Sequence, residues 1–134
     1  MADKVQFEVV TPTHLLVDRQ ADMVVVPGGD GDFGVLPGHS PLLSTVRPGV
    51  LDVYDDGKIT SRYFVAGGFA EVTGERLTLL AEEARPVADL NRADAEERLA
   101  KATANLETAK EGHARTEAER ELKAAEAMAA AADL

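Results

Sequence analysis

The chain of 134 residues contains no cysteine and no tryptophan, and aromatic residues make up only 4% of it. Without cysteine, the chain forms no disulfide and offers no thiol nucleophile or thiolate metal ligand. Basic residues are also scarce, because 14 Lys and Arg stand against 24 Asp and Glu, giving a formal net charge of -10. Such an excess of negative charge opposes binding to nucleic acid and to an anionic membrane surface.

Long apolar runs are missing as well. No segment reaches the roughly 18–20 apolar residues that cross a bilayer, so we expect no direct membrane insertion. Residues 1–10 lack the basic start and the apolar core of a signal peptide. The hydrophobic fraction of 45% is nevertheless too high for a disordered chain.

The composition changes abruptly near Pro86. All six prolines, all four phenylalanines and every valine and isoleucine lie at or before Val87, whereas 16 of the 47 residues after it are alanine. β-Branched and aromatic side chains favour strands, and alanine favours helix. The sequence therefore predicts a β domain over residues 1–87 and a helical domain over residues 88–134.

Residues 1–87 contain short runs of β-forming residues separated by turn signals such as Asp55-Asp56-Gly57 and Gly67-Gly68. The predicted strands cover Val5–Val10, Leu15–Val17, Met23–Val26, Leu42–Val46, Val50–Tyr54, Ser61–Val65, Phe69–Val72 and Arg76–Leu80. A strand about every ten residues, with no helix in between, predicts an antiparallel β-sandwich or flattened barrel.

Two apolar seams at helical spacing follow, with Gly112 between them. The first seam is Ala95, Leu99, Ala102, Leu106 and Ala109, and the second is Ala118, Leu122, Ala125, Ala129 and Ala132. Asp89 or Asn91 is placed to cap the first helix. The pattern predicts an antiparallel two-helix hairpin. Because its seams are mostly alanine, the hairpin buries little area and is predicted to be weakly held.

The segment Gly29–Gly34 matches the spacing G-x-G-x-x-G of dinucleotide-binding loops. Such a loop needs a helix after the glycines to bind phosphate, but here Pro37-Gly38 and further β pattern follow. Asp30 and Asp32 would also repel phosphate. We therefore interpret the segment as an acidic surface loop between strands.

No constellation of residues indicates catalysis or metal binding. His14, His39 and His113 are far apart and lack the spacing of a zinc site. No pair of carboxylates stands out as general acid and base, so we expect no catalytic residue and no metal ligand.

The segment Val26–Leu43 reads Val-Pro-Gly-Gly-Asp-Gly-Asp-Phe-Gly-Val-Leu-Pro-Gly-His-Ser-Pro-Leu-Leu, and Arg47-Pro48-Gly49 follows it. About thirty residues after the Gly-Val-Leu-Pro-Gly-His core, Val65–Val72 reads Val-Ala-Gly-Gly-Phe-Ala-Glu-Val. Together these segments resemble the epsilon subunit of the F-type ATP synthase, bacterial type. That family also has a β-sandwich followed by a helical hairpin, so the resemblance spans the whole chain.

The resemblance implies a non-catalytic central-stalk subunit, part of the rotor, which couples the proton-driven rotation of the c ring through the gamma subunit to ATP synthesis. The expected partners are the gamma subunit, the polar loops of the c ring and, through the helical hairpin, the catalytic alpha and beta subunits. By motif position, Asp30 and Asp32 would face the c ring and His39 would lie near gamma. The expected location is peripheral, on the cytoplasmic face of the bacterial inner membrane.

Two departures from the family limit what can be carried over. Some relatives bind ATP through an Ile/Leu-Asp-x-x-Arg-Ala motif. This chain has Asp89, Arg92 and Ala93 in the matching places, but Ala88 replaces the aliphatic residue, so we expect no nucleotide cofactor. Inhibitory relatives carry a basic second helix. Residues 114–134 contain three basic and five acidic residues, which favours at most a weak regulatory role for the hairpin.

Two alternatives stay open at this point. A stand-alone nucleotide-binding regulator or adaptor module would use Asp89 and Arg92 without the other subunits. An enzyme built on the Gly29–Gly34 loop is disfavoured by the lack of a following helix.

Overall fold

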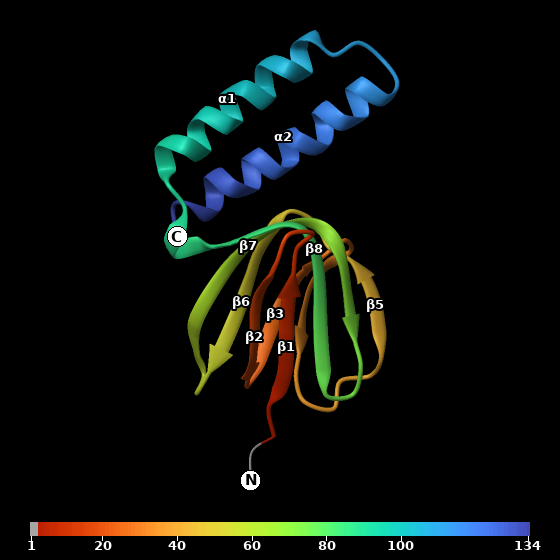
Figure 1. Ribbon diagram of the computed structural model, residues 1–134, viewed down its shortest axis with the longest axis vertical. Helices are drawn as coiled ribbons and strands as arrows, with labels where there is room; N and C mark the ends of the chain where they lie inside the picture. Colours follow the sequence, from red (N-terminus) through yellow and green to blue (C-terminus); the bar gives the residue numbers. More distant parts are fainter. Residues whose placement is uncertain (1–2) are drawn as a thin grey trace.

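The computed structural model describes residues 3–134 as a β-sandwich with a pair of helices across one end (Figure 1). The strands are β1 (Val5–Val10), β2 (Leu15–Ala21), β3 (Met23–Gly28), β4 (Gly31–Val35), β5 (Leu42–Thr45), β6 (Gly49–Asp55), β7 (Lys58–Val72) and β8 (Arg76–Pro86). A short 3-10 turn, η1 (Val87–Asp89), leads into helices α1 (Arg92–Thr108) and α2 (His113–Ala131). The predicted β-sandwich followed by an antiparallel helical hairpin is confirmed.

Two long strands run through both sheets of the sandwich. β7 pairs with β6 through its first half and with β5 through its second half, while β8 follows it along most of its length. One sheet therefore has the order β5-β7-β8-β1-β2, and the other has the order β4-β3-β6-β7-β8. Among the described strands, only the pairing of β1 with β8 is parallel.

The crossing of β7 between the sheets occurs at Gly67 and Gly68, whose φ angles are +68° and +116°. The sequence predicted a turn here between two separate strands, and that prediction is wrong, because one strand continues through both glycines. Before the glycines, Val65 faces the core, but after them Ala70 does, so the inward-facing phase shifts by one residue. A bulge of this kind lets one strand keep its apolar face inward in two differently oriented sheets.

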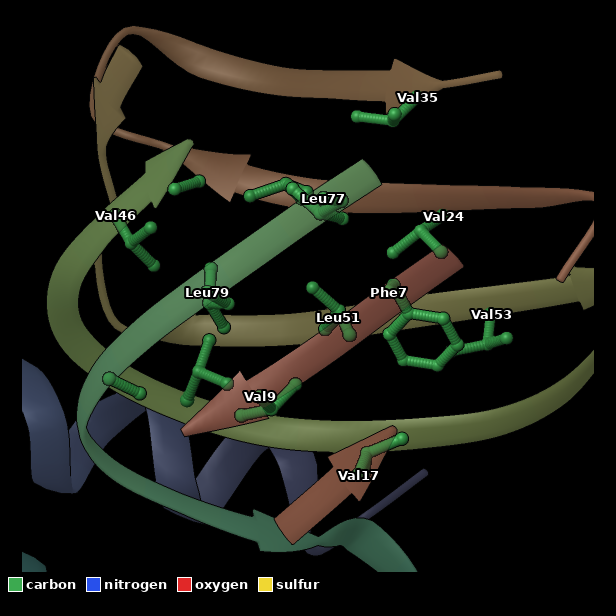
Figure 2. Close-up of a cluster of buried hydrophobic side chains, with 14 of the residues drawn as sticks. Phe7, Val9, Val17, Val24, Val35, Val46, Leu51, Val53, Leu77 and Leu79 are labelled. Atoms are coloured by element: carbon green, nitrogen blue, oxygen red, sulfur yellow. The ribbon is translucent and has the colours of Figure 1, made fainter. Parts of the chain in front are cut away.

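The core of the sandwich consists of alternate residues from both sheets. Figure 2 shows Phe7, Val24, Leu51 and Val53 grouped in the interior, from β1, β3 and β6, and all four are fully buried. Every second residue of a strand contributes to this core, as Val5, Phe7 and Val9 of β1 show. The alternation of β-branched and polar residues in the sequence is thus the pattern that forms the sheet faces.

β4 is the strand that the sequence analysis missed. The predicted acidic loop over Gly29–Gly34 is wrong for most of its length, since the chain turns at Gly29 and Asp30 and then pairs with β3. Val35 is fully buried, and Phe33 packs partly against the same core. The two glycines of β4, Gly31 and Gly34, hide this alternation, because a glycine has no side chain to reveal which face it occupies.

The hairpin has the predicted ends but packs through one more face than predicted. The side chain of Asn91 caps α1 by accepting a hydrogen bond of 3.1 Å from the N–H of Asp94, and Gly112 precedes α2 with a φ of +71°. Helix α2 uses a second face in addition to the seam that faces α1. On this face Ala124 and Met128 point toward the outer side of the sheet that contains β6, where they cover Phe64. The hairpin therefore lies docked on β6 and β7.

The crossing in β7 makes Gly68 a sensitive position. A Cβ at this residue would overlap the carbonyl oxygen of Leu80 and lie 3.0 Å from the Cα of Ala81, in addition to the unfavourable positive φ. We expect Gly68→Ala to lower the free energy of unfolding by about 2 kcal/mol or more. Gly74→Ala is the control, because nothing lies within 4 Å of its added methyl group. Denaturant unfolding measures both, and equal stability of the two variants would contradict the expectation.

Candidate functional site: exposed surfaces of the sandwich and the hairpin junction

The acidic turn that carries Asp30 lies at the same end of the sandwich as the hairpin. The backbone N–H of Gly29 donates to the carbonyl of Thr45 at 2.9 Å, which ties the turn to the end of β5. Asp32 pairs with Arg47, and the same guanidinium donates to the carbonyl of Gly28 at 2.6 Å. Asp30 and Asp32 are both exposed. The turn is thus a braced, negatively charged projection.

His39 lies at the other end of the sandwich. β4 separates it from the Asp30 turn, and a five-residue strand spans about 17 Å. The loop of His39 is held by the N–H of Gly38, which donates to the carbonyl of Gly74 at 2.8 Å. The Nδ1 atom of His39 lies 2.6 Å from the carbonyl oxygen of Ser40, which orients the ring. The residue is half-buried. The structure therefore places Asp30 and His39 apart.

Four apolar side chains lie in a row on the outer face of the sheet β5-β7-β8-β1-β2, which we call the first sheet. Strand register puts Phe69 of β7 beside Leu80 of β8. Leu80 in turn lies beside Val10 of β1, and Val10 pairs with Leu15 of β2. Phe69, Leu80 and Leu15 are 52%, 53% and 53% exposed. We call these four residues the apolar row. A contiguous apolar strip on an outer sheet face is typical of a protein–protein contact.

The residues of the expected nucleotide motif lie at the start of the hairpin. Asp89, Arg92 and Ala93 are all exposed. The Nε atom of Arg92 lies 3.2 Å from Oε1 of Glu96 and 3.4 Å from Oδ1 of Asp133. Two carboxylates therefore lie beside the guanidinium that would contact a phosphate and offset part of its charge.

The strongest polar cluster is centred on Arg98, which the sequence analysis did not single out. Its guanidinium contacts Glu121 at 2.8 and 2.9 Å and Glu83 at 2.9 Å twice. The hydrogen bonds that Glu121 accepts hold its pKa below its usual value. Donation to Glu121 first, and to Glu83 second, raises the pKa of Arg98. The cluster joins β8, α1 and α2. Its partners are far apart in sequence, so spacing alone gave no signal for it.

A second polar cluster joins three turns and strand ends far from the hairpin. Nζ of Lys4 lies 2.7 Å from Asp22, which also accepts a hydrogen bond of 2.7 Å from the N–H of Asp56. The hydrogen bond from Lys4, followed by that from Asp56, lowers the pKa of Asp22. All of these groups lie near the surface, so the cluster fixes turns and presents no reactive side chain.

A cleft of about 480 Å³ lies between the sandwich and the hairpin. Val46, Pro48 and Phe69 line its sandwich side, and Glu117 and Arg120 line its hairpin side. Within residues 3–134, no three His, Asp or Glu side chains converge in a way that would hold a metal ion. The same residues contain no helix with the length and apolar character of a membrane span.

The family model for the β-sandwich domain of the ATP synthase delta/epsilon chain matches residues 4–87. The epsilon chain of Paramagnetospirillum magneticum is 55% identical over 131 residues, which are 98% of both chains. The epsilon chain of Rhodospirillum rubrum is 50% identical over the same share of both chains. This chain belongs to the ATP synthase delta/epsilon family. Because the similarity to epsilon chains includes the hairpin, the expected resemblance to the epsilon subunit is confirmed.

Two solved assemblies contain chains of the same fold. A chain in the OSCP/F1/c-ring structure of the Euglena gracilis mitochondrial ATP synthase superimposes with a TM-score of 0.80 at 24% identity, covering 96% of this chain and 81% of that one. A chain in the central stalk/c-ring structure of the Tetrahymena thermophila mitochondrial ATP synthase gives 0.70 at 14% identity, covering 97% of each. At these identities the matches support the fold alone, from the first strand to the second helix.

Proposed function

We propose that this chain is the epsilon-type subunit in the central stalk of an F-type ATP synthase, where it couples rotation of the c ring through gamma to ATP synthesis. The observation that carries the proposal is the similarity to epsilon chains over 98% of the sequence, sandwich and hairpin together. A stand-alone nucleotide-binding module is disfavoured by this match to a subunit family along the whole chain.

The proposed role is mechanical and not catalytic. A rotor part needs a stiff body with separated contact surfaces, and this sandwich has a dense core with an acidic turn at one end and an apolar row on one face. The ionised groups at the cleft between sandwich and hairpin are engaged with one another, because Arg98 pairs with Glu83 and Glu121. In such a complex the subunit would be peripheral, on the cytoplasmic face of the bacterial inner membrane.

For the gamma subunit, we propose the apolar row as the docking surface, with the half-buried His39 at the edge of the same sheet. The row presents three side chains that are each about half exposed, and covering them would remove apolar area from water. The hairpin packs on the other sheet, and it approaches the row only at Phe69, which lines the cleft between sandwich and hairpin.

Reconstitution tests both the function and this surface. When added to an epsilon-depleted ATP synthase, the wild-type chain is expected to restore proton-driven ATP synthesis. Leu80→Glu places a charge in the middle of the apolar row, and we expect it to weaken binding to the complex at least about tenfold. Leu134→Glu is the control, since Leu134 is 63% exposed but lies outside the row. Equal restoration by the two variants would exclude the row as the docking surface.

The acidic turn is the proposed contact with the polar loops of the c ring. The chain has no cysteine, so Asp30→Cys introduces a single thiol at the tip of the turn. We expect this variant to form a disulfide crosslink with cysteines placed in the c-ring loops of the intact enzyme. Glu75→Cys, in the exposed β7–β8 turn at the opposite end, is expected to give none. Absence of a product from Asp30→Cys in a coupled enzyme would refute the assignment.

We also propose that the chain uses no nucleotide cofactor and that its hairpin contacts the catalytic alpha and beta subunits only weakly. The pairing of Arg92 with Glu96 and Asp133 supports the first point, because two carboxylates beside the guanidinium offset its charge and repel a phosphate. Isothermal calorimetry of the isolated chain with millimolar ATP is expected to give no binding heat. A saturable heat that Arg92→Ala abolishes would overturn this proposal.

A further inference from the structure

The contact between the hairpin and the sandwich is poor in apolar area. Its buried cluster has six members, of which four are alanine; they are Phe64, Ala66, Ala95, Ala124, Met128 and Ala131. The larger side chains that pack against this cluster, Val50, Val87 and Leu90, are only partly buried. An alanine methyl group contributes far less burial than a leucine or phenylalanine side chain. The helices are also polar on most of their surface. Apolar packing alone is therefore a weak anchor for a hairpin of this length.

Arg98 supplies a second anchor at this contact. Its Nη1 and Nη2 atoms each lie 2.9 Å from an oxygen of Glu83, a two-pronged pair that joins α1 to β8. Its Nε and Nη2 atoms lie 2.8 and 2.9 Å from the oxygens of Glu121 on α2. Such two-pronged, charge-assisted pairs are stronger and more directional than a single neutral hydrogen bond.

The position of Arg98 makes this anchor unusual among the ion pairs of the chain. Within residues 3–134, Arg98–Glu83 is the one salt bridge between a strand and a helix of the hairpin. The Arg98 side chain is 23% exposed, so water screens its pairs less than those of Arg92, which is 70% exposed. Met128 also approaches the guanidinium, at 3.7 Å from its sulfur.

We propose that Arg98 is an ionic latch that holds the hairpin on the sandwich. Its pair with Glu83 fixes the hairpin to β8, and its pair with Glu121 fixes α1 to α2. Loss of the first pair frees the hairpin as a unit, while loss of the second weakens the packing of α1 on α2. The latch is a property of the isolated chain, so it goes beyond the proposed stalk function and does not depend on it.

The core of the sandwich does not depend on this latch. The buried cluster inside the sandwich draws on both sheets and contains no residue of the hairpin. Phe64 and Ala66, which the hairpin covers, belong to the separate cluster on the outer face. Release of the hairpin therefore exposes a small apolar surface and leaves the two sheets packed.

The test compares two neighbouring glutamates. Glu83→Gln keeps the size of the side chain but removes the charge that faces Arg98. Glu82→Gln is the matched control, because Glu82 is exposed, forms none of the ion pairs found in residues 3–134 and lies one position earlier in the same strand. In the full chain, hydrogen exchange of the amides in Ala124–Ala131 is expected to rise about tenfold in Glu83→Gln and less than about twofold in Glu82→Gln.

A distance measurement separates release of the hairpin from local fraying. Spin labels at Glu71→Cys and Ala104→Cys, both exposed positions in a chain without cysteine, report the separation of β7 from α1. The distribution is expected to be narrow in the otherwise unchanged chain, broad with Glu83→Gln and narrow with Glu82→Gln. Arg98→Lys keeps the charge but loses the two-pronged geometry, and an intermediate width is expected.

Two results would overturn the latch. If Glu83→Gln and Glu82→Gln gave the same exchange rates and the same distances, apolar packing would hold the hairpin without Arg98. If exchange in β1 rose as much as exchange in α2, the pair would support the whole fold and not the docking of the hairpin. Restored ATP synthesis by Glu83→Gln in the reconstituted enzyme would leave the stalk function intact while these measurements decide on the latch.

Discussion

The two sheets of the sandwich depend on the passage of β7 and β8 from one sheet to the other. At Gly67 and Gly68 the backbone adopts positive φ angles, and the inward-facing phase of β7 shifts by one residue. In β8 the core-facing residues also change from odd to even positions, since Ala81 faces the core before the crossing and Ala84 after it. Because both strands shift together, their pairing stays in register on either side of the crossing. The remaining strands then only add to edges that these two strands define.

The same crossing explains why the two outer faces differ. Before the glycines, β7 turns Phe64 outward beneath the hairpin, and after them it turns Phe69 outward on the uncovered sheet. Glu83 stands opposite Ala66 in the strand pair, so it points toward the hairpin and reaches Arg98. One backbone feature thus supplies both the docking face of the hairpin and one end of the apolar row.

The sequence was informative where a signal is local. Alternation predicted β1 with its observed bounds, and a cap at Asn91 followed from residue type and position. Features that depend on pairing between distant segments could not be predicted in this way. The Arg98 cluster joins residues 15 and 23 positions away, and the apolar row becomes visible only when the register of four strands is known. The division into domains at residue 87 stays a prediction, as do the roles of Asp30, Asp32 and His39.

In the proposed assembly, the sandwich and the hairpin carry different mechanical loads. A force applied to the apolar row acts on β7, β8 and β1, and the first two of these strands continue into the second sheet. That sheet ends in β3 and β4, whose turn carries Asp30. The path from the row to the acidic turn therefore runs through hydrogen-bonded strands and a close-packed core, which resist deformation. The hairpin lies outside this path. It is held by a small apolar cluster around Phe64 and Met128 and by the pairs of Arg98, so its docking can change without loosening the body that transmits the force.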